Sequence, residues 1–162
     1  MLDEHRYGLL PVICKTWSLR GVRVHAPYSY ATTYKWGYLH EALEIDGAND
    51  AQLLFTPAIN QDIHAIFLKQ TADRDPDSLH VVIADQAGFH RQADDTRLPP
   101  NVRLLPQPPY CPELNSVEGF GRLLKTPTAK RLYRNFRQLE NHLIVIAQEW
   151  IKPEKVHSMI HG

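Results

Sequence analysis

The chain has 162 residues and a formal net charge of zero, with 43% hydrophobic and 22% charged residues, which suits one soluble globular domain with a real core. No apolar run approaches the ~20 residues that a membrane helix needs, and the N-terminus lacks a signal-peptide pattern, so neither a membrane protein nor a secreted one is expected. The two cysteines, Cys14 and Cys111, fit no metal motif, and we therefore expect a reduced, cytoplasmic protein.

The N-terminal half of the sequence predicts a run of antiparallel strands followed by a helix. Alternating residues indicate the strands, and Asp46-Gly47 is a turn signal between two of them. Strands are expected at 2–10, 34–45 and 52–55, and a hairpin with an Arg20-Gly21 turn at 15–24. Apolar residues at helical spacing then predict a helix over 60–72, with Asn60 as its N-cap.

The C-terminal half predicts strands and helices in alternation. Residues 79–84 form a continuous apolar run, typical of a strand covered on both faces, and a helix is expected to follow it. A short strand at 102–105 and helices at 115–125 and 136–151 complete the series. The last helix has an apolar stripe, formed by Leu139, Leu143, Ile146 and Trp150. This order is that of an α/β protein with an RNase H-like fold, in which a mixed central sheet with antiparallel N-terminal strands is flanked by helices.

Three acidic residues fall where a catalytic metal site would need them. Asp85 follows the apolar strand at 79–84, at the carboxyl end where sheets of this kind build ligand sites. Glu118 lies in a helix that is entered from a proline-rich loop, and Asp3 lies in the first strand. Three acids on separate elements are able to converge, which is what a protein needs to hold two Mg²⁺ ions and to catalyse phosphoryl transfer.

The charges are distributed unevenly along the chain. Residues 41–95 hold 11 acids and three bases, a balance of −8, whereas residues 97–137 hold eight bases and two acids, a balance of +6. A basic segment beside an acidic metal site suits a nucleic-acid phosphodiester, because the bases offset the backbone phosphates. The alternative is a solvated helix face whose charge is compensated elsewhere on the surface.

Three segments of the chain together resemble the catalytic domain of DDE transposases in the mariner superfamily, in particular its bacterial insertion-sequence branch. These are residues 3–9 with Trp17 and Gly21, residues 85–90, and residues 104–118 with Leu124-Lys125 beyond. The Pro-Tyr-x-Pro-Glu-Leu-Asn-x-Val-Glu segment at 109–118 is the most specific.

The resemblance implies an RNase H-like fold, a triad of Asp3, Asp85 and Glu118 that binds two Mg²⁺ (or Mn²⁺) ions, and DNA strand cleavage and transfer by a homodimer that acts on transposon ends and target DNA. The basic residues expected to contact DNA phosphates follow the last acid: Arg122, Lys125, Lys130, Arg131 and Arg134.

The segments depart from the family pattern at several positions. Gln86 replaces a usual Asn, Ser116 a usual Pro and Gly121 a frequent Trp. Gly119 and Gly121, within one helical turn, should each weaken that helix by ~1 kcal/mol relative to Ala. The helix-turn-helix region that precedes this domain in family members is not seen. We therefore interpret residues 1–162 as a catalytic domain with a truncated first strand, either without that region or with it on a separate polypeptide.

The two acids in the C-terminal half also have structural interpretations. Asp85 could be a turn residue or the N-cap of the following helix. Glu118 has the spacing of a capping box with Asn115, in which its carboxylate would accept the backbone N–H of that residue. Glu118 could also form an i,i+4 ion pair with Arg122. Asn115 is also a possible auxiliary residue of the site.

Two further residues near the predicted acids have open roles. Because side chains alternate along a strand, only one of Asp3 and Glu4 can point at the site. His90 could contact a substrate phosphate, donate to a carboxylate, or be a structural residue at a helix start. Two other functions stay open for the chain as a whole: a non-catalytic remnant or assembly module, and a stand-alone RNase H-like nuclease.

Overall fold

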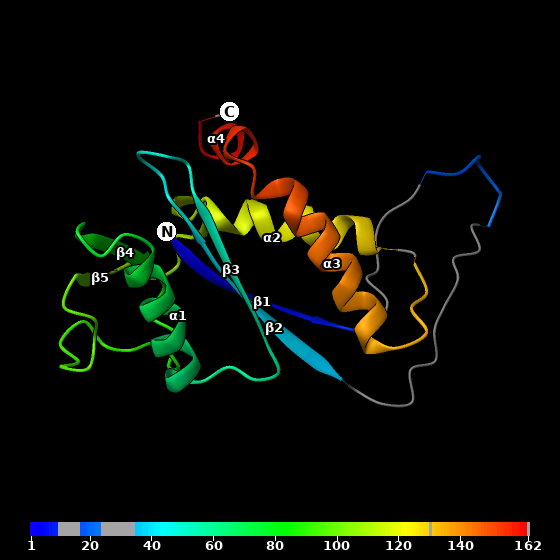
Figure 1. Ribbon diagram of the computed structural model, residues 1–162. Coiled ribbons are helices and arrows are strands. Elements are labelled where there is room, and N and C mark those ends of the chain that lie inside the picture. Colours follow the sequence, from blue (N-terminus) through cyan, green and yellow to red (C-terminus); the bar gives the residue numbers. More distant parts are fainter. Residues whose placement is uncertain (10–16, 24–34, 130, 162) are drawn as a thin grey trace.

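The computed structural model describes residues 1–9, 17–23, 35–129 and 131–161 (Figure 1). These residues form β1 (Leu2–Gly8), β2 (Trp36–Leu43), β3 (Ala51–Thr56), α1 (Gln61–Arg74), β4 (His80–Ala84), β5 (Val102–Pro106), α2 (Val117–Lys125), α3 (Phe136–Trp150) and α4 (Pro153–His161), with 3-10 turns at Pro112–Leu114 and Thr126–Thr128. None of the helices in this part of the chain has the length and apolar character that crossing a membrane requires.

The strands form two ladders. β1, β2 and β3 pair in this order and are antiparallel, whereas β4 and β5 pair in parallel. β1 and β4 are in contact at the border between the ladders, although no backbone ladder joins them within the described residues. The mixed strand arrangement with antiparallel N-terminal strands agrees with the predicted fold class.

Alternate residues of β1 face two separate hydrophobic cores. Leu2 packs with Phe67 of α1 and with residues of β4 and β5. Tyr7 packs with residues of α2, α3 and α4, which lie on the other side of the strands (Figure 1). Because side chains alternate along a strand, Asp3 lies on the face of Tyr7 and Glu4 on the face of Leu2.

Most of the predicted elements are confirmed. α1 begins after Asn60, whose side chain caps the helix by accepting the N–H groups two and three residues further on. The stripe of α3 buries Leu139 and Leu143 against the core of β1, β2 and β3. Residues 17–23 of the predicted hairpin contain the expected turn but no strand. The other predicted strand and hairpin residues 10, 15, 16, 24 and 34 lie outside the described residues.

The helix predicted after Asp85 is wrong, because residues 85–101 form turns and bends. Two aspartate side chains close these turns. Asp85 Oδ1 accepts the N–H of Ala87 at 2.9 Å, and Asp95 Oδ1 accepts the N–H of Arg97 at 2.9 Å. Short side chains that bind nearby backbone N–H groups compete with the helical hydrogen-bond pattern. Asp85 is therefore a turn residue and not a helix cap.

The expectation that the strand at 79–84 is covered on both faces is also wrong. Val82 and Ala84 are buried, but Val81 is 57% exposed and Leu79 is 61% exposed. α1 packs on the buried face, whereas α2, α3 and α4 pack on β1, β2 and β3. One face of the parallel ladder is thus uncovered by the described residues.

Candidate active site

The structure places the three predicted acids in or next to β1 and two elements that contact it. Asp3 lies in β1, Asp85 directly follows β4, and Glu118 is the second residue of α2. Both β4 and α2 contact β1. The side chain of Asp3 is 20% exposed and that of Asp85 is 60% exposed, and Glu118 is also exposed. All three carboxylates therefore reach the surface, where a nucleic-acid phosphate has access.

The surroundings of Asp3 disfavour the ionised form of its carboxyl group. Burial raises the pKa of Asp3, and the negative charges of Glu4 and Glu118 raise it further, against the opposing effect of His5. Repulsion between carboxylates favours protonation, and a bound cation relieves it. Oxygen ligands of this kind are those that Mg²⁺ prefers, so the residues fit the metal that the sequence predicts. The three predicted acids do not bring ligand atoms within 4.8 Å of one another in the described part of the chain.

Asn115 fixes the start of α2 against β1. Its buried side chain donates from Nδ2 to the carbonyl of Leu2 at 3.2 Å, and its Oδ1 accepts the N–H of Val117 at 3.1 Å. α2 begins after Ser116 without a side-chain cap, so the capping box that the spacing allowed is not formed. Asn115 therefore positions the helix that carries Glu118 beside the strand that carries Asp3.

The loop that leads to α2 is anchored to the end of β4. The N–H of Gln107 donates to the carbonyl of Ala84 at 2.8 Å, and Gln86 donates from Nε2 to the carbonyl of Gln107 at 3.0 Å. Gln107 also donates from its own side chain to the carbonyl of Cys111. These bonds tie the segment after Asp85 to the loop before α2. They also give Gln86, where the family usually has Asn, a clear structural role.

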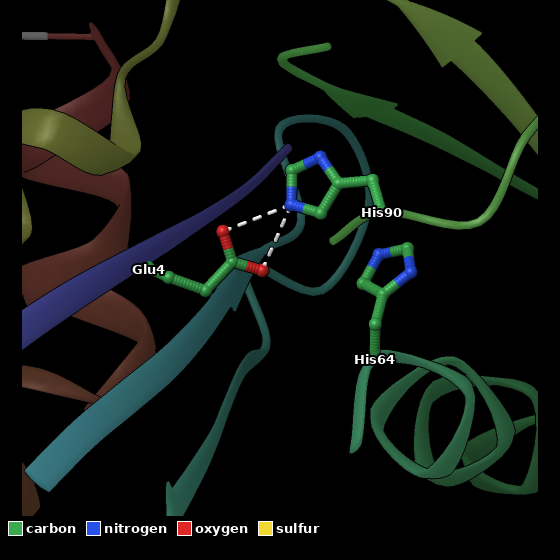
Figure 2. A group of neighbouring side chains, drawn as sticks. All are labelled: Glu4, His64 and His90. Atoms are coloured by element: carbon green, nitrogen blue, oxygen red, sulfur yellow. Dashed lines mark hydrogen bonds and ion pairs between the residues drawn. The ribbon is translucent and has the colours of Figure 1, made fainter. Parts of the chain in front are cut away.

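Glu4 is a buried acid whose role the sequence did not reveal. It accepts hydrogen bonds from His90 Nε2 at 2.9 and 3.0 Å, drawn in Figure 2, and from His40 Nδ1 at 3.3 Å. Burial alone would raise the pKa of Glu4, but the bonds from the two histidines lower it to about 2. His40 stands opposite Glu4 in the β1–β2 register, a pairing that the strand patterns in the sequence did not specify.

His90 is 4% exposed, so it does not reach a substrate phosphate. It lies in a turn and not at a helix start. Its Nδ1 lies 2.8 Å from the carbonyl oxygen of Asp85 and 3.1 Å from Asp85 Oδ1, while its Nε2 faces Glu4. Of the interpretations that the sequence left open, the structure forms the hydrogen bond to a carboxylate, which is that of Glu4.

The basic residues predicted to contact DNA follow Glu118 along the chain. Arg122, Arg131 and Arg134 are exposed and Lys125 is partly exposed, whereas Lys130 lies outside the described residues. Arg131 Nη1 lies 3.3 Å from a ring nitrogen of His142. The charged groups of the arginines are therefore open to solvent on the side of the molecule that carries α2 and α3.

Three solved structures share this fold over nearly the whole chain. A Mos1 transposase paired-end complex with left transposon end has a TM-score of 0.62 and 17% identity, and the match covers 99% of this chain and 50% of that one. The Mos1 strand transfer complex has a TM-score of 0.65 and 19% identity, with 99% and 49% coverage. A Mos1 mariner paired-end complex with Mn has a TM-score of 0.64 and 20% identity, with 99% and 50% coverage.

This likeness confirms the predicted RNase H-like fold. The chain spans about half the length of the Mos1 chains that it matches. No curated protein sequence matches it. The family model described as DDE superfamily endonuclease matches residues 1–140, which is most of the sequence. The chain therefore belongs to the DDE superfamily endonuclease family.

Proposed function

We propose that the chain is the catalytic domain of a DDE transposase of the bacterial insertion-sequence branch, which cleaves DNA strands and transfers them with the help of two Mg²⁺ or Mn²⁺ ions. The observation that carries this proposal is the placement of the three acids: Asp3 lies in β1, and β4, which Asp85 directly follows, and α2, which carries Glu118, both contact that strand. The Asn115 bond to the Leu2 carbonyl supports that placement. Asp85 supplies a third carboxylate from the strand next to β1.

In the proposed site Asp3, Asp85 and Glu118 would hold the ions. Held there, the ions would supply activation of a water or a DNA 3′-hydroxyl and stabilisation of the leaving 3′-oxygen. The chain itself positions the ligands: β1 sets Asp3, the turn after β4 sets Asp85, and Asn115 sets Glu118 through the start of α2. Exposed arginines beyond α2 offset the charge of the flanking phosphates.

The proposed partners are DNA, as transposon ends and as target, and a second copy of the chain in the active homodimer. A helix-turn-helix region, on this protein or on a separate polypeptide, would select the ends, and the assembly would act in the cytoplasm. The Mos1 structures support the DNA partner, because they are complexes of that transposase with a transposon end or a strand-transfer product.

Metal linkage tests the site directly. A ligand that binds only the folded state stabilises it by RT ln(1 + [L]/Kd), or about 1.4 kcal/mol at ten times Kd. Mn²⁺ or Mg²⁺ should therefore raise the melting temperature of the wild type, and Asp85→Asn should abolish the rise. Asp94→Asn is the matched control, because Asp94 is an exposed acid in the same turn region. A full metal response in Asp85→Asn would place the ions elsewhere and remove the proposal.

A strand-transfer assay separates the proposal from its alternatives. Pre-cleaved transposon-end duplexes with a free 3′-hydroxyl should join to a target plasmid in Mn²⁺, once an end-binding region is supplied. Cleavage of DNA without joining would identify a stand-alone nuclease. If the protein is folded and binds Mn²⁺ but neither cleaves nor joins DNA, it is a non-catalytic remnant.

A further inference from the structure

Glu4, His64 and His90 form a buried cluster on the face of β1 opposite Asp3 (Figure 2). Each offers one ligand atom, and these atoms lie within 4.8 Å of one another. The hydrogen bonds show that the cluster is not arranged for a metal ion. A metal-bound histidine donates from its second ring nitrogen, whereas His64 Nδ1 accepts the N–H of Arg91 at 3.0 Å.

Both ring nitrogens of His90 are already engaged. Nε2 faces the two carboxylate oxygens of Glu4, and Nδ1 faces the carbonyl oxygen and Oδ1 of Asp85. All of these partners are acceptors, so the ring donates from both nitrogens, as only the imidazolium form does. His64 stacks on this ring with centroids 4.5 Å apart and an interplanar angle of 30°. Glu4, His90 and Asp85 therefore form a chain of donors and acceptors between β1 and the end of β4, and His64 of α1 packs against it.

This chain of bonds crosses the border between the two sheets, where no backbone ladder joins β1 to β4 in the described part of the chain. β1 belongs to the three-stranded ladder and β4 to the two-stranded one. Glu4 is the neighbour of Asp3 on β1, and Asp85 is the first residue after β4. The Glu4–His90–Asp85 bridge therefore joins the two strands at the level of the two acids.

The bridge engages one oxygen of Asp85 and leaves the other available. Oδ1 takes the N–H of Ala87 at 2.9 Å and faces His90 Nδ1 at 3.1 Å. Oδ2 makes no hydrogen bond with the described residues, and the side chain is 60% exposed. A carboxylate held by one oxygen and exposed at the other is suited to bind a cation with a fixed orientation.

We propose that His90 is a positioning residue for the metal site: through Glu4 it holds Asp85 against β1 and so sets the distance between Asp85 and Asp3. The inference rests on the proposed function, because it assigns His90 a role toward that same site. Removal of a residue that hydrogen-bonds to a metal ligand typically lowers metal affinity or activity 10–100-fold. His90→Gln removes one of the two donors and should raise the Kd for Mn²⁺ by about that factor.

The test is a Mn²⁺ titration followed by electron paramagnetic resonance, with each variant shown to be folded at the working temperature by circular dichroism. Glu4→Gln keeps the size of the side chain and removes the charge that faces His90, so it should also raise the Kd. The double variant should be no weaker than His90→Gln alone, since both changes break one bridge. His80→Gln is the matched control, because His80 lies on β4 and its Nε2 faces the carbonyl of Asp75.

A structural role alone would lower the melting temperature and leave the Kd unchanged. An unchanged Kd in folded His90→Gln or in folded Glu4→Gln overturns the inference while the metal site stands. A wild type whose Mn²⁺ binding does not depend on Asp85 overturns the proposed function, and the inference with it. Raised Kd values in both variants, with the wild-type value in His80→Gln, support the positioning role.

Discussion

The imidazole ring of His5 occupies the space that a Cβ atom at position 121 would need. A Cβ built on Gly121 would lie 1.8 Å from His5 Nε2, far inside any allowed contact. α2 can therefore approach β1 this closely only with glycine at this position. On its other side His5 Nδ1 lies 3.3 Å from the buried carboxylate of Glu41. Gly121 stands where the family often has Trp, and His5 explains why a large residue is excluded here.

The two glycines of α2 should respond in opposite ways to alanine. Gly121→Ala must displace His5, and overpacking of this kind costs about 1–3 kcal/mol, more than the ~1 kcal/mol that alanine gains in a helix. Gly119→Ala meets nothing within 4 Å, so it should stabilise the protein by up to ~1 kcal/mol. Urea unfolding of both variants measures the difference. If Gly121→Ala proves as stable as Gly119→Ala, the His5 side chain moves aside without a loss of stability, which contradicts the prediction.

Removal of one hydroxyl group should weaken the contact between β1 and α3. The Tyr7 hydroxyl donates to Glu140 Oε1 at 2.7 Å, and its ring stacks on Phe136 with centroids 5.4 Å apart. Tyr7→Phe keeps the ring and loses a bond to a charged acceptor, which should cost about 1.5 kcal/mol. Chemical unfolding measures this cost. Tyr38→Phe on β2 is the control and should change stability by less than about 0.5 kcal/mol. Equal costs for the two variants would contradict the prediction.

Sequence patterns correctly predicted the elements that depend on residues close together in the chain. Asn60 preceded a helical pattern and caps α1, and the Leu139–Leu143 spacing identified the buried face of α3. The helix after Asp85 failed because aspartate side chains close turns there. α4 was not predicted, although its Val156 is fully buried in the same core as α3. The packing that stabilises this short helix comes from residues distant in the sequence.

In the candidate site, too, local patterns were predicted correctly and long-range contacts were not. The alternation rule correctly separated Asp3 from Glu4 onto two faces of β1. It could not show that Glu4 contacts His90, because 86 positions separate the two residues in the chain. The turn after β4 brings His90 back to β1, and no local pattern encodes that return. The auxiliary role of His90 stays a prediction, and the structure adds the contacts of its ring with Glu4 and Asp85.

The neutral histidine of the cluster should make stability depend on pH. Burial, together with the charge of His90, lowers the pKa of His64 to about 4, whereas an unfolded histidine has a pKa of about 6.5. Between these values the unfolded chain binds the extra proton and the folded chain does not. The stabilisation is therefore complete above pH ~6.5 and is lost as the pH falls toward 4.

His64→Asn measures this effect, because asparagine offers an oxygen to the N–H of Arg91 and does not titrate. The free energy of unfolding of the wild type minus that of the variant should fall as the pH decreases from 7 to 4. Other titrating groups are common to both proteins and cancel in the difference. A difference that stays constant across this range would show that His64 is protonated in the folded state as readily as in the unfolded one.

DNA binding by this chain alone should be weak and without sequence preference. Exposed Arg122, Arg131 and Arg134, together with partly exposed Lys125, offer charge to phosphates, and phosphate contacts position a duplex without reading its sequence. About four such contacts should give a log–log slope of affinity against salt near −3.6. Charge reversal at Arg131 and Arg134 should lower the affinity for a transposon-end duplex and for a scrambled one equally, and reduce the slope by about 2. Filter binding across a salt series measures both quantities.

Lys69→Glu is the matched control for these charge reversals. Lys69 lies on α1 and pairs with Asp73 at 2.8 Å, on the helix that covers the opposite side of β1 from α2. Its reversal changes the net charge of the protein without touching the predicted DNA surface, so the slope should keep its wild-type value. A loss of affinity in Lys69→Glu as large as that per reversed charge at Arg131 and Arg134 would mean that net charge alone drives binding. Tight, salt-insensitive or sequence-selective binding by the wild type would instead reveal a DNA-reading element within this chain.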